Sequence, residues 1–381
     1  MLLKTLKQLL VLHKETSLKN RYIHSKSILP YLHNKCIICR VAEIGESVNG
    51  EKINSITIGT GPKKVLMWSQ MHGNESTSTK AIFDLLNTLQ AKNSVAASIL
   101  EACTIKIIPI LNPDGALAYT RLNANQVDLN RDAQELTQPE TKALIDCYKS
   151  FKPHFCYNLH GQRTIFSAGN NNKTASVSFL APAQDKACTI TKNRKQAMEL
   201  IAAMYAVLQK QIPNQVAVYD DTFNINCVGD TFQHFGVPTM LFEAGHVHND
   251  YNREMVREYI YQSLVVSLSY IANKQVTGAG YKPYLKIPEN KKCFFDIIIR
   301  NAKVAGNIVD VAVQYEEQLK DGKIDFVPKI ARMELLSNYF AHKTIQAHEY
   351  EVVNKQGEEL VINQTLNYLL INNEEYSLKL R

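Results

Sequence analysis

From about residue 40 to about residue 272, short apolar runs alternate with amphipathic segments, and this alternation constrains the fold more than any other feature. The run Val65-Leu-Met-Trp-Ser-Gln-Met71 predicts a buried strand, and the apolar residues between Ser76 and Leu89 recur at helical spacing. Similar pairs follow along the chain. Strands that alternate with helices are typical of a mostly parallel sheet covered on both faces. The sequence therefore predicts a mixed, mostly parallel α/β sheet with helices on both sides.

Residues that can bind a metal stand at the ends of three predicted strands. His72 ends the first strand and Glu75 follows three residues later, His160 ends the strand predicted at 155–159, and Glu243 ends a later apolar run. Open α/β sheets place their ligands at the carboxyl ends of the strands, so these residues are expected at one edge. A catalytic zinc typically takes three protein ligands and leaves one position to water. The pattern indicates a metal site at this edge.

Two local signals lie between these strands. Asn112-Pro-Asp-Gly115 predicts a tight turn after the strand that begins at Thr104. Thr137-Gln-Pro-Glu140 predicts a helix that runs to about Phe151, with Thr137 as its N-cap, a proline in the first turn and a glutamate three residues after the cap.

The last hundred residues differ in pattern from the rest. Residues 276–283 are predicted to form a linker, and alternating runs such as 294–300 indicate strands. We therefore expect a catalytic domain at residues 1–275 and a small β-rich domain at residues 284–381, with a role in packing or assembly.

Composition excludes several function classes. The net charge of +7 is mild for 381 residues and is spread along the chain, so nucleic acid is not an expected partner. No segment reaches the roughly 20 apolar residues that span a bilayer, and the first 24 residues predict an amphipathic helix rather than an export signal. The eight cysteines are mostly isolated, which indicates free thiols and a cytoplasmic location. Cys36-Ile-Ile-Cys39 has no second pair, so structural thiols are expected there.

Taken together, the residues resemble the zinc carboxypeptidase (metallocarboxypeptidase) family, from about residue 20 to about residue 272. The resemblance implies a carboxypeptidase-like α/β fold of the phosphorylase/hydrolase type. The motifs that carry it are, in order, His72-Gly-Asn-Glu75, Asn112-Pro-Asp-Gly115, Arg121-Leu-Asn123 with Val127-Asp-Leu-Asn-Arg131, His160 at a strand end, and Phe242-Glu243.

The resemblance also implies roles at the metal. His72, Glu75 and His160 would bind one Zn²⁺ per chain. Asp128 would orient the His72 ring, which fixes the tautomer and raises the basicity of the ligand. Glu243 would be the general base on the water that attacks the substrate.

For the substrate, the resemblance implies a second set of residues. Arg121 would hold the developing oxyanion, and Asn130 with Arg131 would bind the free carboxylate of the terminal residue. Tyr219 is the nearest candidate for the family's mobile tyrosine. Asp230 lies where the pocket for the terminal side chain is usually shaped, which hints at a basic substrate residue.

The chain departs from the family pattern at two positions. Gln162 stands where many members have tyrosine, and Asp132 stands where asparagine is common. Neither departure touches the predicted ligands. His246 and His248 follow the base on a loop, so surface or pocket-wall positions are expected for them.

These observations leave several functions open. The leading hypothesis is a metallocarboxypeptidase that releases a C-terminal residue from a peptide. The spacing of 85 residues between Glu75 and His160 (160 minus 75) is short for a digestive-type enzyme. An N-acyl amino acid deacylase of the desuccinylase and aspartoacylase type, or a cell-wall peptide amidase, is therefore a rival. An inactive carboxylate-binding module is a third possibility, and the oligomeric state is left open.

Overall fold

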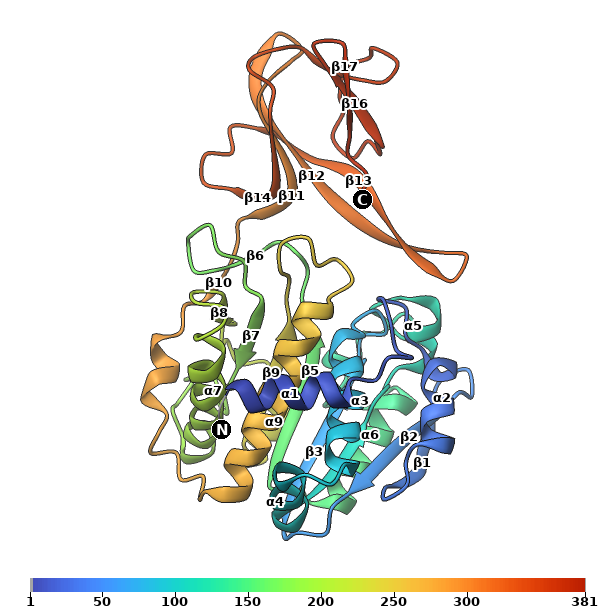
Figure 1. Cartoon of the computed structure of the whole chain (residues 1–381), viewed down its shortest axis with the longest axis vertical. Helices are drawn as coiled ribbons and strands as arrows, with labels where there is room; N and C mark the ends of the chain where they lie inside the picture. The colour runs from blue at the N-terminus through green and yellow to red at the C-terminus, as the bar shows by residue number, and fades with distance from the viewer. Residues whose placement is uncertain (1–2, 381) are drawn as a thin grey trace. The chain divides into compact units, whose positions relative to one another are not determined.

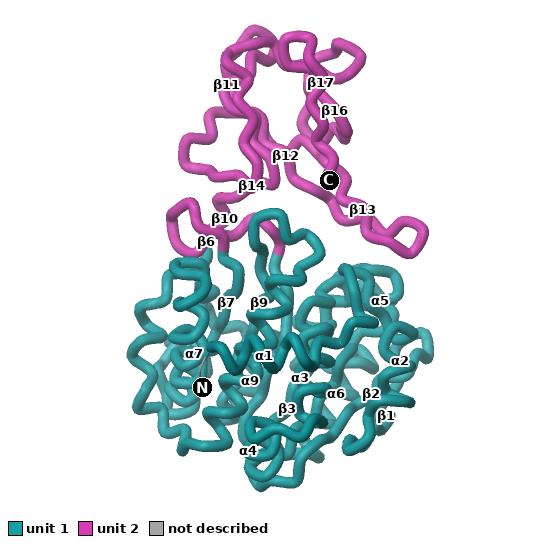
Figure 2. The backbone as a smooth tube through the Cα atoms, viewed as in Figure 1, with its two compact units in different colours: residues 1–162, 175–290 teal, residues 163–174, 291–381 magenta. Residues whose placement is uncertain are grey.

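The computed structural model describes residues 3–380 (Figure 1). The chain divides into two compact units (Figure 2). Unit 1 extends to residue 162 and continues from 175 to 290, and unit 2 combines residues 163–174 with the chain from 291 onward. The excursion of residues 163–174 into unit 2 leaves no signal in the local sequence pattern, because it depends on pairing with strands more than a hundred residues away.

The predicted division into domains at residues 1–275 and 284–381 stays a prediction. The compact units are cut at residue 290, and a 3₁₀ helix, η2 (Lys282–Lys286), begins within the expected linker and extends past its end.

An eight-stranded mixed sheet forms the centre of unit 1. Four of its seven strand pairs are parallel: β4 with β3, β3 with β5, β5 with β9, and β7 with β8. This confirms the predicted fold class. The strands, in spatial order, are β1 (Arg40–Glu46), β2 (Lys52–Ile58), β4 (Cys103–Ile108), β3 (Lys63–Ser69), β5 (Phe155–Gly161), β9 (Thr239–Ala244), β7 (Val177–Leu180) and β8 (Val216–Val218).

Helices cover both faces of this sheet, because successive side chains of the central strands enter two different cores. Along β3, Val65 and Met67 pack in one core, whereas Leu66 and Trp68 pack in the other. The second core is closed by α6 (Pro139–Phe151) and α8 (Val228–His234). The first is closed by α1 (Leu3–His13), α2 (Ser25–Asn34), α3 (Thr77–Gln90), α4 (Ser94–Ala102), α7 (Lys192–Leu208) and α9 (Glu254–Asn273). No helix between residues 3 and 380 is long and apolar enough to cross a membrane.

Local structure differs from the prediction at two motifs. Asn112 starts the short helix α5 (Pro113–Ala118) rather than a tight turn, because its side chain accepts the Gly115 N–H at 2.8 Å. Helix α6 has Gln138, not Thr137, at its N-cap position. The Thr137 hydroxyl instead donates to Asp132 at 2.7 Å, so a partner five residues earlier in the chain takes the hydroxyl that was expected to cap the helix.

Unit 2 is rich in β-structure, as expected for the C-terminal region. Its core includes Ile297 and Val311 from neighbouring strands. The strands are β6 (Phe166–Ala168) paired with β10 (Asn290–Lys292), then β13 (Lys323–Glu334), β12 (Asn307–Lys320), β11 (Phe294–Val304) and β14 (Phe340–Gln346) in one sheet, and β15 (Val352–Asn354), β16 (Tyr368–Ile371) and β17 (Glu374–Ser377) in another.

Candidate metal centre

The three predicted metal ligands converge at the carboxyl edge of the sheet in unit 1. Nδ1 of His72 lies 2.9 Å from one carboxylate oxygen of Glu75, and Nδ1 of His160 lies 3.0 Å from the other. The two Nδ1 atoms are 3.2 Å apart. Among residues 3–380, this is the one group of three or more such side chains whose ligand atoms gather this closely.

The donor set fits a zinc ion. Two imidazole nitrogens and a carboxylate are ordinary zinc ligands, and ligand bonds of about 2.0–2.1 Å place tetrahedral ligand atoms about 3.3 Å apart. Here the two Nδ1 atoms are 3.2 Å apart, each lies 2.9 or 3.0 Å from a different oxygen of Glu75, and one ligand atom from each of the three residues lies within 4.8 Å of the others. The three side chains therefore need only small movements to hold one ion and leave a position for water.

The turn that carries His72 packs against the segment Asn112-Pro-Asp-Gly115. A Cβ on Gly73 would lie 1.9 Å from the carbonyl carbon of Gly115, so only glycine permits this close backbone approach. The Asn112 side chain donates to the Met71 carbonyl at 3.2 Å. The second sequence motif thus supports the first.

Burial and mutual contact set the charges of the ligands. Burial alone would raise the pKa of Glu75, but the adjoining His72 and His160 rings hold it well below its usual range. Burial lowers the pKa of His160, and the contact with Glu75 offsets only part of this effect. Burial alone would lower the pKa of His72, but Glu75 and Asp128 raise it, so this ring has to release its proton when a metal binds, because metal ligands must be deprotonated.

Asp128 and Arg121 also contact His72, Asp128 at Nε2 and Arg121 at Nδ1. Asp128 accepts from Nε2 of His72 at 3.1 Å, which is the contact predicted for it, and it also accepts the Asn130 N–H at 2.9 Å. Burial alone would raise the pKa of Asp128, but His72 and Arg121 lower it below its usual range. The Arg121 guanidinium donates to Asp128 at 3.0 and 3.2 Å and lies 3.2 Å from Nδ1 of His72.

Glu243 lies directly opposite His160. The two residues are register partners on the parallel strands β5 and β9, so their side chains share a face of the sheet. Oε2 of Glu243 is buried and has no hydrogen-bond partner among the described residues. Burial and the nearby Glu75 raise the pKa of Glu243 well above its usual value. A buried carboxyl group with a raised pKa beside possible metal ligands is typical of an acid-base group.

Asn130 and Arg131 belong to the 3₁₀ helix η1 (Leu129–Arg131), which packs against the start of α8. The Asn130 side chain accepts the Val228 N–H at 3.0 Å, and Arg131 donates to the Cys227 sulfur at 3.1 Å. Arg131 itself is exposed. The Asn130–Arg131 pair is therefore anchored by its backbone and amide while the guanidinium reaches solvent.

Other predicted residues occupy less central positions. Tyr219 follows β8, where its backbone N–H donates to the Phe179 carbonyl at 3.0 Å. Burial raises the pKa of Asp230 to about 6, and its carboxylate accepts the Asn224 N–H at 3.1 Å. His246 is buried, with its ring 4.7 Å from that of Tyr251, and His248 is exposed.

Sequence reasoning missed Asn158, which is fully buried on β5. Both polar atoms of its side chain have no hydrogen-bond partner within residues 3–380. Alternate residues of a strand share a face, so Asn158 faces the same side as His160. This period-two relation was available in the sequence and could have identified Asn158 as a polar group beside the site.

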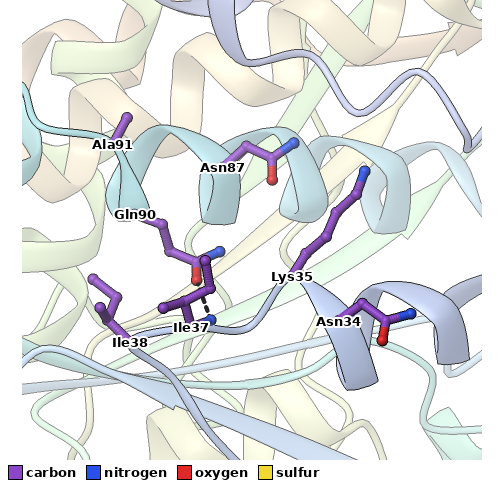
Figure 3. A pocket seen from close by; sticks show the side chains of 7 residues that line it. All are labelled: Asn34, Lys35, Ile37, Ile38, Asn87, Gln90 and Ala91. Carbon is purple, nitrogen blue, oxygen red and sulfur yellow. Dashed lines mark hydrogen bonds between the residues drawn. The ribbon is translucent and has the colours of Figure 1, made fainter.

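Two cavities lie away from these residues. The first, of about 320 Å³, borders the loop after α2, where the Ile37 N–H donates to the Gln90 side chain at 2.9 Å (Figure 3). The neighbouring Cys36 and Cys39 are free thiols, as predicted. The second cavity, of about 560 Å³, lies at the amino ends of the strands and includes His154. Neither cavity is lined by a predicted site residue.

Comparison with known proteins identifies the family. The family model described as zinc carboxypeptidase matches residues 29–228, more than half of the 381 residues. Carboxypeptidase 2 of Trichophyton rubrum is 33% identical over 100 residues, which cover 26% of this chain and 19% of that protein. Carboxypeptidase M of Mus musculus is 28% identical over 201 residues, or 45% of each chain. The chain thus spans less than half the length of these relatives.

Solved structures share the fold at low sequence identity. A metallo-carboxypeptidase from Burkholderia cenocepacia is 18% identical with a TM-score of 0.51, and the match covers 64% of this chain and 68% of that one. Carboxypeptidase A from Helicoverpa armigera is 16% identical with a TM-score of 0.53, over 74% and 81% of the two chains. With the family match over residues 29–228, this chain belongs to the zinc carboxypeptidase family.

Proposed function

We propose that this protein is a zinc-dependent metallocarboxypeptidase that releases the C-terminal residue of a peptide. The observation that carries the proposal is the group His72, Glu75 and His160 with the buried carboxyl group of Glu243 opposite His160. The match to the family model supports the proposal independently. Because this match ends at residue 228, the role proposed for Glu243 rests on the geometry of the site alone. The related carboxypeptidases supply the expected reaction class.

The residues at the metal would work as follows. His72, Glu75 and His160 hold one zinc ion per chain, which when bound would act as a Lewis acid and lower the pKa of a water molecule. Glu243 takes a proton from the attacking water and passes it to the leaving nitrogen, a task suited to a carboxyl group with a raised pKa. Asp128 keeps the His72 ring in place through the contact at Nε2.

The substrate would be held by exposed cationic and polar groups. The Arg121 guanidinium lies beside Nδ1 of His72, where it can stabilise negative charge on the carbonyl oxygen during attack. Arg131, supported by Asn130, would bind the terminal carboxylate through a two-pronged contact. We keep Tyr219 as a further candidate for substrate contact.

The substrate class is tested with zinc-loaded protein and three matched panels: peptides with a free C-terminus and their C-terminal amides, N-acyl amino acids, and muropeptides. We expect the free peptides to be the dominant substrates and the amides to react slowly, because an amide offers Arg131 no charge. A dominant rate on acyl amino acids or muropeptides would contradict the proposal. So would a zinc content far below one per chain, which favours a binding module.

The carboxylate contact is tested by R131Q. Loss of a charged, two-pronged hydrogen bond of about 1.5–3 kcal/mol is expected to raise KM for free peptides about 10- to 100-fold. The matched control is R40Q at the exposed start of β1, which should leave KM unchanged. An R131Q enzyme with the wild-type KM and the wild-type preference over amides would remove Arg131 from this role.

A further inference from the structure

Arg253 is a buried arginine at the N-cap of α9 whose side chain reaches back to the edge of the sheet. It is 2% exposed and has a φ of +58°, a left-handed conformation that few residues other than glycine adopt. The first turn of α9 is held separately, because Asp250 accepts the N–H groups of Glu254, Met255 and Val256. The Arg253 side chain makes no capping hydrogen bond to the helix, and its guanidinium instead bonds to the edge of the sheet.

The guanidinium of Arg253 bridges the ends of two strands. One of its terminal nitrogens donates to the carbonyl of Ala244 at 2.7 Å and to that of Gly245. The other donates to the carbonyl of Gln162 at 2.9 Å. Ala244 ends β9 and Gln162 directly follows β5, so one planar group is bonded to both strands.

These hydrogen bonds lie where the backbone pairing between β5 and β9 ends. The β5–β9 pairing ends with Gly161 opposite Ala244, and the last backbone bond joins the Gln162 N–H to the Ala244 carbonyl at 3.0 Å. Gly245 then turns toward β7, where a Cβ would lie 1.9 Å from the Ala175 carbonyl oxygen. Beyond this point, the Arg253 side chain replaces the missing backbone bonds.

The strand ends joined by Arg253 carry His160 and Glu243, one pair before the end of the ladder. We propose that Arg253 is a positioning residue: by tying the end of β5 to the end of β9, it fixes Glu243 relative to the metal ligand His160. The inference rests on the proposed function, in which Glu243 is the general base.

The test uses R253K and R253Q in the full chain. Lysine keeps the charge but lacks the planar fork, and glutamine loses both, so neither can bond to both strand ends in the same way. A displacement of about 1 Å at a reacting group can reduce a rate about 100-fold. We expect kcat to fall about 10- to 100-fold in both variants, while KM and the zinc affinity, measured by chelator competition, stay within about twofold of wild type.

The matched control is R257K, one turn further along α9. Arg257 is equally buried, but it pairs with Asp84 and lies outside the strand ends. R257K should lower the unfolding midpoint and leave the kcat of the folded enzyme unchanged. A purely structural role for Arg253 would give R253K this same pattern.

A second measurement does not depend on activity. Hydrogen exchange of the Gln162 amide, measured by mass spectrometry, should be faster in both Arg253 variants and unchanged in R257K. A wild-type protein without peptidase activity would contradict the proposed function. The exchange rates alone would then test whether Arg253 holds the ends of β5 and β9 together. Wild-type kcat in the two variants, or unchanged exchange at Gln162, would overturn the inference. If R253Q does not fold, R253K gives the decision.

Discussion

Unit 1 contains two groups of buried charges that are built in opposite ways. Between α3 and α9, Arg257 binds Asp84 through two bonds of 2.6 and 2.7 Å, and Lys80 binds Glu254 at 2.6 Å. Every charge in this helix cluster (Asp84, Lys80, Glu254 and Arg257) has an opposite partner. At the sheet edge, Glu243 instead lies near another carboxylate, and one of its oxygens has no partner among the described residues.

The helix cluster, in which every charge is paired, is expected to contribute to stability, whereas the Glu243 carboxyl group is expected to contribute to reactivity. A buried charge that loses its partner destabilises the fold strongly, so the helix cluster holds α3 against α9 only while it is complete. Burial raises the pKa of Asp84 even though Arg257 is bound to it, which indicates that the cluster depends on full hydrogen bonding. Under the proposed function, the carboxyl group of Glu243 at the sheet edge transfers a proton, a role for which a shifted pKa is suited. Substitutions in the two groups should therefore affect different measurements.

The largest effect is expected for E243Q. Removing a general base lowers kcat by about 10³-fold, since proton transfer contributes roughly 10²–10⁴. The amide has the same shape, so zinc content and the free energy of unfolding should stay within about 1 kcal/mol of wild type. Stopped assays, metal analysis and urea unfolding check these points. Retained turnover in E243Q would sink the mechanism.

The reverse result is expected for D84N in the helix cluster. This change removes the fully buried partner of Arg257 and leaves only the partly exposed Glu254 at 3.3 Å, so it should reduce the free energy of unfolding by about 3–5 kcal/mol. The kcat of the remaining folded enzyme should be unchanged. The control is E43Q, because Glu43 forms an exposed pair with Lys52 that is expected to contribute less than about 1 kcal/mol. A D84N protein as stable as E43Q would refute the comparison.

Glu254 makes the stability of the helix cluster depend on pH. Burial alone would raise the pKa of Glu254, but Lys80 and Lys14 lower it to about 2. A carboxyl group with a depressed pKa contributes stability above its unfolded pKa of about 4.5, and this contribution is lost as the pH falls toward 2. E254Q should therefore destabilise the protein by about 3 kcal/mol at pH 7, because Lys80 loses its partner. The difference in the free energy of unfolding between E254Q and the wild type should be smaller at pH 3.5. If this difference in the free energy of unfolding did not change with pH, the depressed pKa of Glu254 would be contradicted.

The smallest effect, with the opposite sign, is expected for Asp230 near Arg131. Burial raises the pKa of Asp230 to about 6, so the folded protein binds its proton more tightly than the unfolded chain between about pH 3.8 and 6. Stability consequently falls as the pH rises through this window. D230N should stabilise the protein by about 2 kcal/mol at pH 7 and remove that slope, as thermal unfolding at pH 4 and pH 7 can measure. If D230N were less stable than the wild type, the contacts of the Asp230 carboxylate would stabilise the fold by more than its burial destabilises it.

Much of the fold and of the candidate metal group followed from local pattern. The apolar runs located β3, β5 and β9 because burial selects apolar residues over a short stretch of chain, and the strand-end rule then brought His72, His160 and Glu243 to one edge. Helices α2 and α4 and the true N-cap of α6 were missed. The N-cap of α6 was missed because Asp132, five residues before Thr137, accepts from the Thr137 hydroxyl, and the cap signal read at Thr137 does not include this competing partner. The cytoplasmic location stays a prediction.

The sequence by itself determined which chemical groups the protein has and in which order the strands deliver them, because strand periodicity and ligand type are local properties. Only the tertiary structure decided that Glu243 lies opposite His160, that Asp128 contacts Nε2 of His72, and that Arg253 joins the two strand ends. Each of these contacts joins segments whose relative position is set by the register and packing of the whole sheet. No short window of sequence contains the information that fixes them.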